Sequence, residues 1–337
     1  MISNAPSMPY TAHSERRSRR MFLSSLSAVV GTSIIIVIGF LLSRRGIISK
    51  KGGEMLSSIV MSVALPCMIL SKFQNDCSIE VFTSIIPALY ASAAAIVLSI
   101  LLGFIMGKII RIPVTRIGQF ISSVAFSNFG FIGIPMVDAI FGDKGSAPMM
   151  MFYFLQLIVV NTVGIMLTKH DAAAISGAGS RRTAGDVLKG LLSPPTIAIV
   201  VSLVLMFAGI KLPKVIMIAV DCMSDLTSPL ALVFVGNMVF NMGFKNMKPE
   251  KGVIEAVVGR LILSSAIMIG AAKFFGVTGT AFLVLTLEMA LSCAAQPATI
   301  SRTIGADTEY TTKILIYSIF GSVITVPLVM MVAEMLM

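Results

Sequence analysis

The sequence predicts an all-α integral membrane protein of ten transmembrane helices, arranged as two inverted repeats of five helices. Apolar residues make up 56% of the 337 positions, and charged residues only 12%, about half the ~25% that is usual in soluble domains. Ten apolar segments are long enough to span a bilayer, which takes about 20 residues. Proline-broken segments also recur at matching positions in the two halves. These observations exclude a water-soluble globule.

The ten predicted spans are apolar stretches separated by mostly short connections. They cover about residues 22–43, 54–73, 84–107, 116–141, 147–168, 191–210, 217–241, 253–275, 279–301 and 313–335. The long connection, 169–190, is rich in Ala, Gly and Ser and divides the spans five and five. We therefore expect a polar basic N-terminal tail (1–20), a first five-helix repeat (21–168), a cytoplasmic linker loop (169–190) and a second, inverted five-helix repeat (191–337).

The net charge of +10 would suggest nucleic acid in a soluble protein. Here the basic residues gather in short loops, where they set the orientation of a membrane protein. One face carries sixteen loop Lys and Arg and the opposite face five. The sequence therefore predicts a multi-pass plasma membrane protein with both termini non-cytoplasmic, with the lipid bilayer and not nucleic acid as its partner. The arginines at the end of the tail favour the opposite orientation.

Catalytic and metal-binding signatures are missing from the sequence. The four cysteines form no CxxC pair and there are only two histidines, so we expect neither a metal site nor a cofactor. The GxxxxGK[ST] motif is absent, so ATP is not the direct energy source. An intramembrane enzyme that uses Glu288 and Asp138 as an acid/base pair is the alternative. Against it, the sequence has no HExxH motif and no Ser or Cys with a His partner in the membrane. We do not expect an enzyme.

Prolines indicate corresponding breaks in the two halves. Pro66 and Pro135 are 69 residues apart, and Pro229 and Pro297 are 68 apart. With an odd number of spans in each half, the halves must be inverted relative to each other, as in many secondary transporters. Ordinary proline kinks without any site are the alternative interpretation.

The fourth and ninth predicted spans carry the strongest signals for interrupted helices. The fourth contains Asn128, Gly133 and Pro135, and the ninth contains Gln296 followed by Pro297. Glycine weakens a helix and proline removes a backbone donor. Half-helix N-termini that meet near the membrane midplane would stabilise an anion. We therefore predict that these five residues bind the substrate.

Charged residues within spans are costly and invite a functional interpretation. Glu288 in the ninth span is expected either to exchange a coupling ion or to hydrogen bond a neighbouring helix. Arg260 in the eighth span is expected either to snorkel to the headgroups or to pair with Glu288 or with a substrate carboxylate. Asp138 is expected either to complement the dipole of the second half of span four or to take part in ion coupling.

Four stretches form a recognisable series: residues 64–66 (Ala-Leu-Pro), 128–142, 228–232 followed by Gly236, and 296–305 leading to 325–327. In their order and spacing they resemble the auxin efflux carrier family, the bacterial and archaeal relatives of plant PIN proteins. The resemblance implies ten helices in two inverted repeats, similar to sodium/proton antiporters and bile-acid symporters. Spans 1, 2, 6 and 7 would form a scaffold domain, and the others a transport domain in which interrupted spans 4 and 9 cross.

The resemblance also implies a function. Members of the family move organic anions, so we expect a secondary transporter of an auxin-like anion or of a dicarboxylate such as malonate or malate, working by alternating access. A proton or sodium ion would be the coupling partner, and the scaffold suggests a homodimer. The plant proteins place an amide beside each crossover proline, whereas here Gln296 precedes Pro297 but Ile134 precedes Pro135. The alternatives are an ion-coupled symporter or cation/proton antiporter of the same fold, and a non-transporting membrane sensor.

Overall fold

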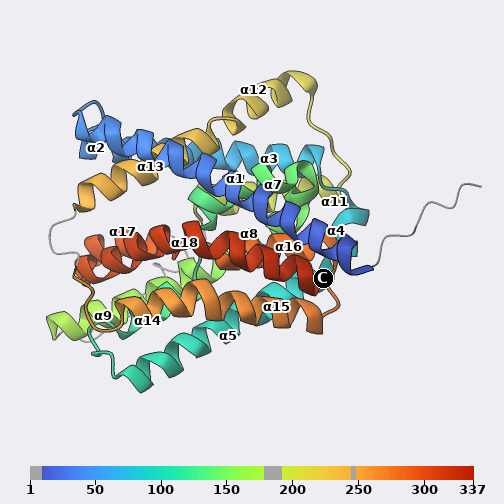
Figure 1. Ribbon diagram of the computed structural model, residues 1–337. Helices are drawn as coiled ribbons and strands as arrows, with labels where there is room; N and C mark the ends of the chain where they lie inside the picture. The colour runs from blue at the N-terminus through green and yellow to red at the C-terminus, as the bar shows by residue number, and fades with distance from the viewer. Residues whose placement is uncertain (1–9, 178–191, 244–247) are drawn as a thin grey trace, which may run out of the picture.

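The protein is described by a computed structural model over residues 10–177, 192–243 and 248–337. In these ranges its regular structure is helical apart from one isolated β-bridge (Figure 1). The α-helices are α1 (Tyr10–Arg44), α2 (Lys50–Ile59), α3 (Leu65–Asn75), α4 (Ile79–Ser84), α5 (Ile86–Ile110), α6 (Ile117–Ala125), α7 (Ile134–Phe141), α8 (Ser146–Val159), α9 (Ile165–Ser176), α11 (Pro194–Phe207), α12 (Lys214–Ser224), α13 (Thr227–Met242), α14 (Val253–Val258), α15 (Ser264–Phe274), α16 (Gly279–Ala290), α17 (Gln296–Ile304) and α18 (Thr308–Leu336).

Short π-helical and 3₁₀ turns link several of these helices. The π turns are η1 (Val60–Ala64), η2 (Phe129–Gly133), η4 (Val160–Gly164) and η5 (Gly259–Leu263), and the 3₁₀ turn is η3 (Gly142–Gly145). A π turn inserts an extra residue into a helix and often occurs at a functional site. Two of them, η1 and η2, are followed without a break by α3 and α7, whose second residues are Pro66 and Pro135. Proline inside a continuous helix removes one backbone donor, so it disturbs the regular α-helical hydrogen bonding at these positions.

The chain is a multi-pass membrane protein by the length and composition of its helices. Among the described residues, seven helical stretches are long and apolar enough to cross a bilayer: Ser18–Arg44, Lys50–Asn75, Ile86–Ile110, Phe129–Ser176, Lys214–Met242, Val253–Phe274 and Thr308–Leu336. Two shorter apolar helices, α11 and α16, fall within the predicted sixth and ninth spans. The stretch from Phe129 to Ser176 has 48 residues and contains the fifth predicted span together with part of the fourth.

Two predicted boundaries differ from the structure. The polar tail was expected to extend to residue 20, but α1 begins at Tyr10, so its second half is helical. The linker loop was expected from residue 169, but α9 continues to Ser176. The tail arginines within α1 and Lys169 within α9 do not interrupt these helices, because Arg and Lys have high helix propensities. Residues 1–9 and 178–191 of these two predicted parts lie outside the described residues.

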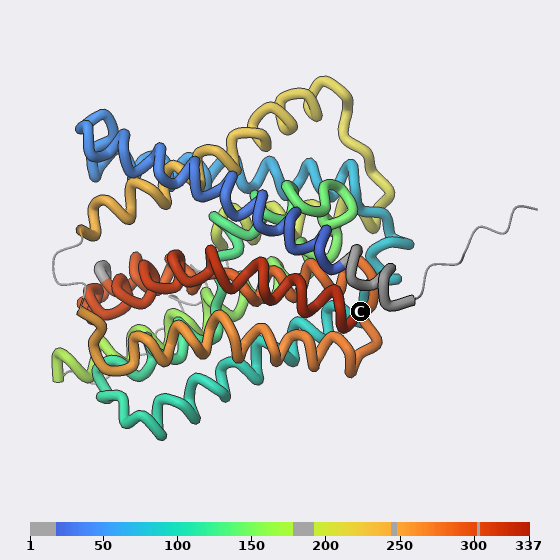
Figure 2. The backbone as a smooth tube through the Cα atoms, viewed as in Figure 1, coloured from blue at the N-terminus to red at the C-terminus, as the bar shows by residue number. Residues whose placement is uncertain are grey.

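The helices form two groups that pack against each other (Figures 1 and 2). The upper group consists of α1, α2, α3, α11, α12 and α13, and the lower group of α5, α6, α8, α9, α14, α15, α16, α17 and α18. The long helices α1 and α18 run along each other at the boundary, and α7 contacts both groups.

Glycines allow the closest helix contact in the upper group. A Cβ on Gly39 of α1 would lie 2.4 Å from the carbonyl oxygen of Val233, and one on Gly236 of α13 would lie 2.1 Å from that of Ile36. Both positions therefore require glycine, and the backbones of α1 and α13 touch, as small residues permit in membrane helices.

Candidate functional site

Two helix breaks pair with each other inside the protein. Helix α6 ends at Ala125 and α16 ends at Ala290, and the chain after each is extended. The amide of Asn128 donates to the carbonyl of Ser292 at 2.8 Å, and the amide of Ala294 donates to the carbonyl of Phe126 at 2.8 Å. Backbone groups freed at membrane depth must find partners within the protein. Here each break supplies the partners of the other.

Arg260 holds the helix ends that lead into both breaks. This residue of η5 is fully buried, and its guanidinium donates to the carbonyls of Ala125 (2.9 Å), Val124 (3.3 Å), Leu291 (3.2 Å) and Met289. Carbonyls at helix C-termini have no partner in their own helix and carry partial negative charge, which a guanidinium stabilises. The expectation that Arg260 snorkels to the headgroups is wrong, because these four carbonyls keep it in the interior.

The paired breaks form one wall of a small cavity. The cavity has a volume of about 30 Å³ and is lined by residues of both breaks, including Asn128 and Gln296, by Tyr153 of α8, and by Met61 and Leu65 of the upper group. Asn128 and Tyr153 are buried, and neither the side-chain nitrogen of Asn128 nor the hydroxyl of Tyr153 has a hydrogen-bond partner. A cavity of this size holds about one water molecule. Unpartnered buried polar atoms are rare and mark places where a ligand, water or ion belongs.

Sequence reasoning did not single out Tyr153 or Gln156, which both support the first break from α8. Gln156 accepts from the hydroxyl of Ser127 at 2.9 Å and donates to the Ser127 carbonyl at 2.8 Å. The two residues are three positions apart and so share one helix face. The signal available in the sequence was the amide side chain of Gln156 within an apolar span.

Glu288 lies next to Gly133 of the turn η2, which follows the first break. The side chain is fully buried in α16, and neither carboxyl oxygen has a hydrogen-bond partner. A Cβ on Gly133 would lie 2.6 Å from Glu288 Oε2, so a larger residue in η2 would displace the Glu288 carboxyl group. Among the ion pairs of the described residues, none joins Glu288 to Arg260.

The remaining predicted residues lie around this centre. Pro135 and Pro297 are buried at the second positions of α7 and α17. Pro297 lies directly after the second break, whereas Pro135 lies about one and a half turns into the helical stretch that starts at Phe129. Pro135 also borders a gap between α1 and α7. The structure therefore brings Asn128 and Gln296 to one cavity and places Gly133 against Glu288.

Asp138 lies elsewhere, at one end of the molecule. It is the fifth residue of α7, beyond the first turn, so the predicted dipole role is wrong. Its carboxylate pairs with Lys72 Nζ of α3 at 3.1 Å, and Lys72 also lies 3.6 Å from Asp76 and 3.9 Å from Asp143. These residues line a cavity of about 330 Å³, here called the acidic vestibule, with Asp221 and Asp225.

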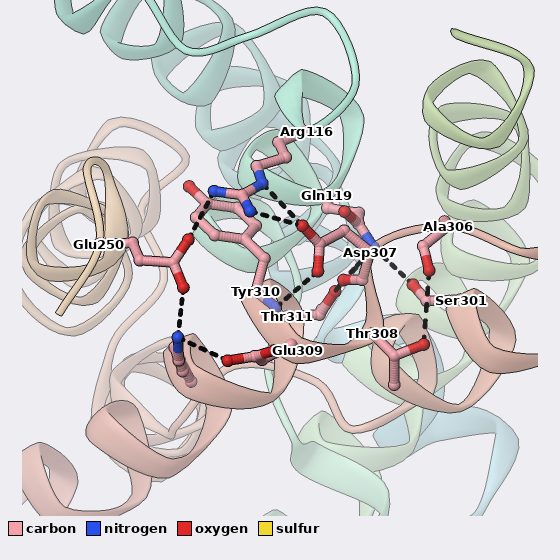
Figure 3. A network of polar contacts seen from close by, with 11 residues as sticks. Arg116, Gln119, Glu250, Ser301, Ala306, Asp307, Thr308, Glu309, Tyr310 and Thr311 are labelled. Carbon is pink, nitrogen blue, oxygen red and sulfur yellow. Dashed lines mark hydrogen bonds and ion pairs between the residues drawn. The ribbon is translucent and has the colours of Figure 1, made fainter. Parts of the chain in front are cut away.

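A second polar cluster ties together the lower group at its other end (Figure 3). Arg116 donates to Glu250 at 2.6 Å and to Asp307 at 2.7 Å, and Lys313 donates to the other oxygen of Glu250. Hydrogen bonds from Lys313 and then Arg116 hold the pKa of Glu250 below its ordinary value. We call these four residues the Arg116 cluster; it joins the segment before α6 to the segment before α14 and to α18.

Buried hydrogen bonds next to the Arg116 cluster fix the start of α6. Gln119 donates from its side chain to the hydroxyls of Ser301 (2.7 Å) and Thr311 (2.8 Å). The carboxylate of Asp171, on α9, accepts from the amides of Gly118 (2.9 Å) and Gln119 (2.7 Å). A carboxylate at a helix N-terminus satisfies free amides and complements the dipole.

Seven membrane-length apolar stretches, together with paired breaks around unpartnered polar groups, define a polytopic membrane protein with an internal polar site. The chain belongs to the membrane transport protein family, the auxin efflux carrier family, whose model matches residues 24–330. This confirms the resemblance found in the sequence.

Two archaeal relatives cover nearly the whole chain. An uncharacterized transporter of Methanocaldococcus jannaschii is 23% identical over 303 residues, which are 88% of this chain and 93% of the relative. An uncharacterized transporter of Methanothermobacter thermautotrophicus is 22% identical over 317 residues, 91% of this chain and 98% of the relative. The protein is therefore related to transporters along almost its full length.

Proposed function

We propose that the protein is a secondary transporter of small organic anions, either auxin-like or a dicarboxylate such as malonate or malate. The supporting observation is the cavity at the paired breaks, where the side-chain nitrogen of Asn128 and the hydroxyl of Tyr153 have no partner. In this proposal the ten predicted spans form two inverted repeats in the plasma membrane, with both termini non-cytoplasmic and a homodimer through the scaffold.

The chemistry of the cavity favours an anion. Asn128, Tyr153 and Gln296 can each donate a hydrogen bond into it. Helix α17 begins at Gln296, so its free amides and partial positive charge lie at the cavity. Arg260 adds a full positive charge next to both breaks while its hydrogen bonds go to backbone carbonyls. Arg260 would therefore attract a carboxylate by charge and hold the site in shape.

The size of the cavity supports alternating access. A volume of about 30 Å³ is smaller than a dicarboxylate, so a substrate requires the wall to move. Met61 and Leu65 of the upper group face the breaks across the cavity. Separation of the two helix groups, with the breaks moving as part of the lower group, would open the site on one side at a time.

Uptake of radiolabelled malonate and malate into proteoliposomes tests the proposal. Asn128→Ala removes a donor to a charged group, which contributes about 1.5–3 kcal/mol. We expect uptake at low substrate concentration to fall about tenfold or more. Asn241→Ala is the matched control, because Asn241 hydrogen bonds within α13 and does not line the cavity. Absence of flux of every carboxylate in both directions would overturn the proposal, and binding without flux would indicate a sensor.

A second candidate function is that of an ion-coupled symporter or cation/proton antiporter of the same fold. The acidic vestibule is the observation that supports it. Five carboxylates and one lysine line it, and such an excess of negative charge concentrates cations. Dependence of malonate uptake on a sodium or proton gradient would favour symport. Cation exchange without any carboxylate flux would favour the antiporter.

A further inference from the structure

Glu288 is the buried ionisable group that the proposed substrate site leaves without a role. Its side chain is fully enclosed between α16 and η2, and neither carboxyl oxygen has a hydrogen-bond partner. An ionised carboxylate without hydrogen bonds in an apolar interior is very unfavourable. The side chain therefore holds a proton in the conformation observed.

The charges around Glu288 are few. Arg260 is the charged side chain whose field reaches it. The neighbouring turn η2 has no ionisable side chain. Two charged groups on other elements packed against α16 form ion pairs at the two ends of the molecule: Asp138 pairs with Lys72, and Lys313 with Glu250 and Glu309. The remaining ionisable residues on those elements are Tyr153 of α8, Tyr90 and Lys108 of α5, Asp143 and Lys144 of η3, Lys273 of α15 and Tyr310, Tyr317 and Glu334 of α18.

We propose that Glu288 is a proton-binding site whose protonation controls binding of the anionic substrate at the paired breaks, so that a proton and an anion are transported together. The inference rests on the proposed function. It follows from the position of Glu288 of α16 against Gly133 of η2, the turn whose first three residues line the substrate cavity. Gly133 lies three residues after Gly130, which borders the cavity.

Charge balance gives the direction of the coupling. When Glu288 is neutral, Arg260 leaves the breaks with one net positive charge, which attracts an anion. When Glu288 is ionised, its charge cancels that of Arg260 and the attraction is lost. Binding of the proton and the anion is therefore mutually favourable, and reciprocal coupling of this kind commonly changes affinity about 5–150-fold. The proton binds to a carboxylate oxygen on one side of the membrane and leaves from the same oxygen on the other.

Glu288→Gln is the direct test in proteoliposomes, with radiolabelled malonate as the probe. Glutamine has the shape of the neutral acid and cannot release a proton. We expect an inward proton gradient to drive malonate accumulation by the unaltered protein. The variant should still exchange internal for external malonate, without pH dependence, and should lose gradient-driven accumulation. Glu54→Gln, which changes an exposed carboxylate on α2, should behave like the unaltered protein.

Two outcomes would overturn the inference: accumulation driven by the proton gradient in Glu288→Gln, or exchange by the unaltered protein that does not depend on pH. Failure of the unaltered protein to move malonate or malate at all would instead count against the proposed function.

Infrared difference spectroscopy of the purified protein provides a readout that does not require transport. We expect the carbonyl stretching band of a protonated carboxylic acid at neutral pH, absent in Glu288→Gln and retained in Glu54→Gln. If the band is missing from the unaltered protein, Glu288 is ionised and the inference fails, whether or not the variant folds well enough for transport.

Discussion

The two ends of the molecule use charged residues in different ways. In the acidic vestibule, Lys72 of the upper group pairs with Asp138 of α7, which continues directly from the first break. In the Arg116 cluster, Arg116, Asp307 and Lys313 belong to the lower group, and Glu250 lies on the segment that leads into it. The first set of contacts joins the upper group to α7, the helix that follows the first break, whereas the second holds one group together.

This difference indicates which contacts must break when the two helix groups separate during transport. If the groups separate during transport, the Lys72–Asp138 pair must open and close, while the Arg116 cluster can travel as one body. Exposed or half-buried ion pairs contribute little free energy, so the pair can open readily. The buried hydrogen bonds of Asp171 and Gln119 make the lower group rigid.

The largest expected effect comes from a covalent link across the acidic vestibule. A short bifunctional thiol reagent that joins cysteines at positions 72 and 138 should abolish malonate uptake, because it ties the two groups together. The same link between positions 116 and 250 should leave uptake in place. Cys222 and Cys67 are first replaced by serine, since neither is buried. Equal inhibition by both links would remove the distinction between the two ends.

Removal of Asp171 should cause the largest loss of stability. Asp171→Ala leaves two buried amides at the start of α6 without an acceptor, and unsatisfied buried donors cost about 1–3 kcal/mol each. We expect a loss of about 2–3 kcal/mol, measured by thermal unfolding in detergent. Asp143→Ala, which changes a carboxylate with an 86% exposed side chain, should have almost no effect. Similar midpoints for both variants would show that α6 does not depend on this cap.

Neutralisation of Lys72 should loosen the vestibule. Lys72→Gln removes the positive charge between Asp76, Asp138 and Asp143, and the carboxylates then repel each other. A cysteine introduced at Ser228, which lines the vestibule, should react several-fold faster with a water-soluble thiol reagent. The same substitution combined with Asp138→Asn should react more slowly than Lys72→Gln alone. Unchanged labelling would mean that the pair does not restrict the vestibule.

The smallest effect should be the pH dependence contributed by Glu250. Because hydrogen bonds from Lys313 and Arg116 lower its pKa in the folded protein, its stabilising contribution is complete above its ordinary pKa of 4.5. That contribution is lost as the pH falls through the lower folded value. With 33% of its side chain exposed, we expect about 0.5–1 kcal/mol. Thermal unfolding between neutral and acidic pH should show this decrease, and Glu250→Gln should remove it.

The presence of the helix breaks could be predicted from the sequence because glycine and proline weaken a helix locally. The second break lies directly before Gln296 and Pro297, as expected. The first lies at residues 126–128, before Gly133 and Pro135, which are both in continuous helical turns. Membership of the transport family was predicted from short stretches in a fixed order. The family match over residues 24–330 confirms that prediction. Where the sequence predicts ten spans, the described residues hold seven membrane-length stretches and two shorter apolar helices. One reason is that α6 and α16 end early, at the two breaks.

The partners of charged residues could not be predicted, because they come from distant parts of the chain. Arg260 binds Ala125, 135 positions away, and nothing near Arg260 in the sequence indicates free carbonyls there. Lys72 and Asp138 likewise meet only after the two groups pack. Sequence reasoning placed Arg260 and Asp138 within apolar segments. Their partners depended on which groups tertiary packing brought beside them.

The glycine contact between α1 and α13 restricts which substitutions this protein can accept. Main chain contacts main chain at Gly39 and Gly236, so any larger side chain at either position would push the two helices apart. Substitutions on the outward faces of α1 and α13 leave their spacing unchanged.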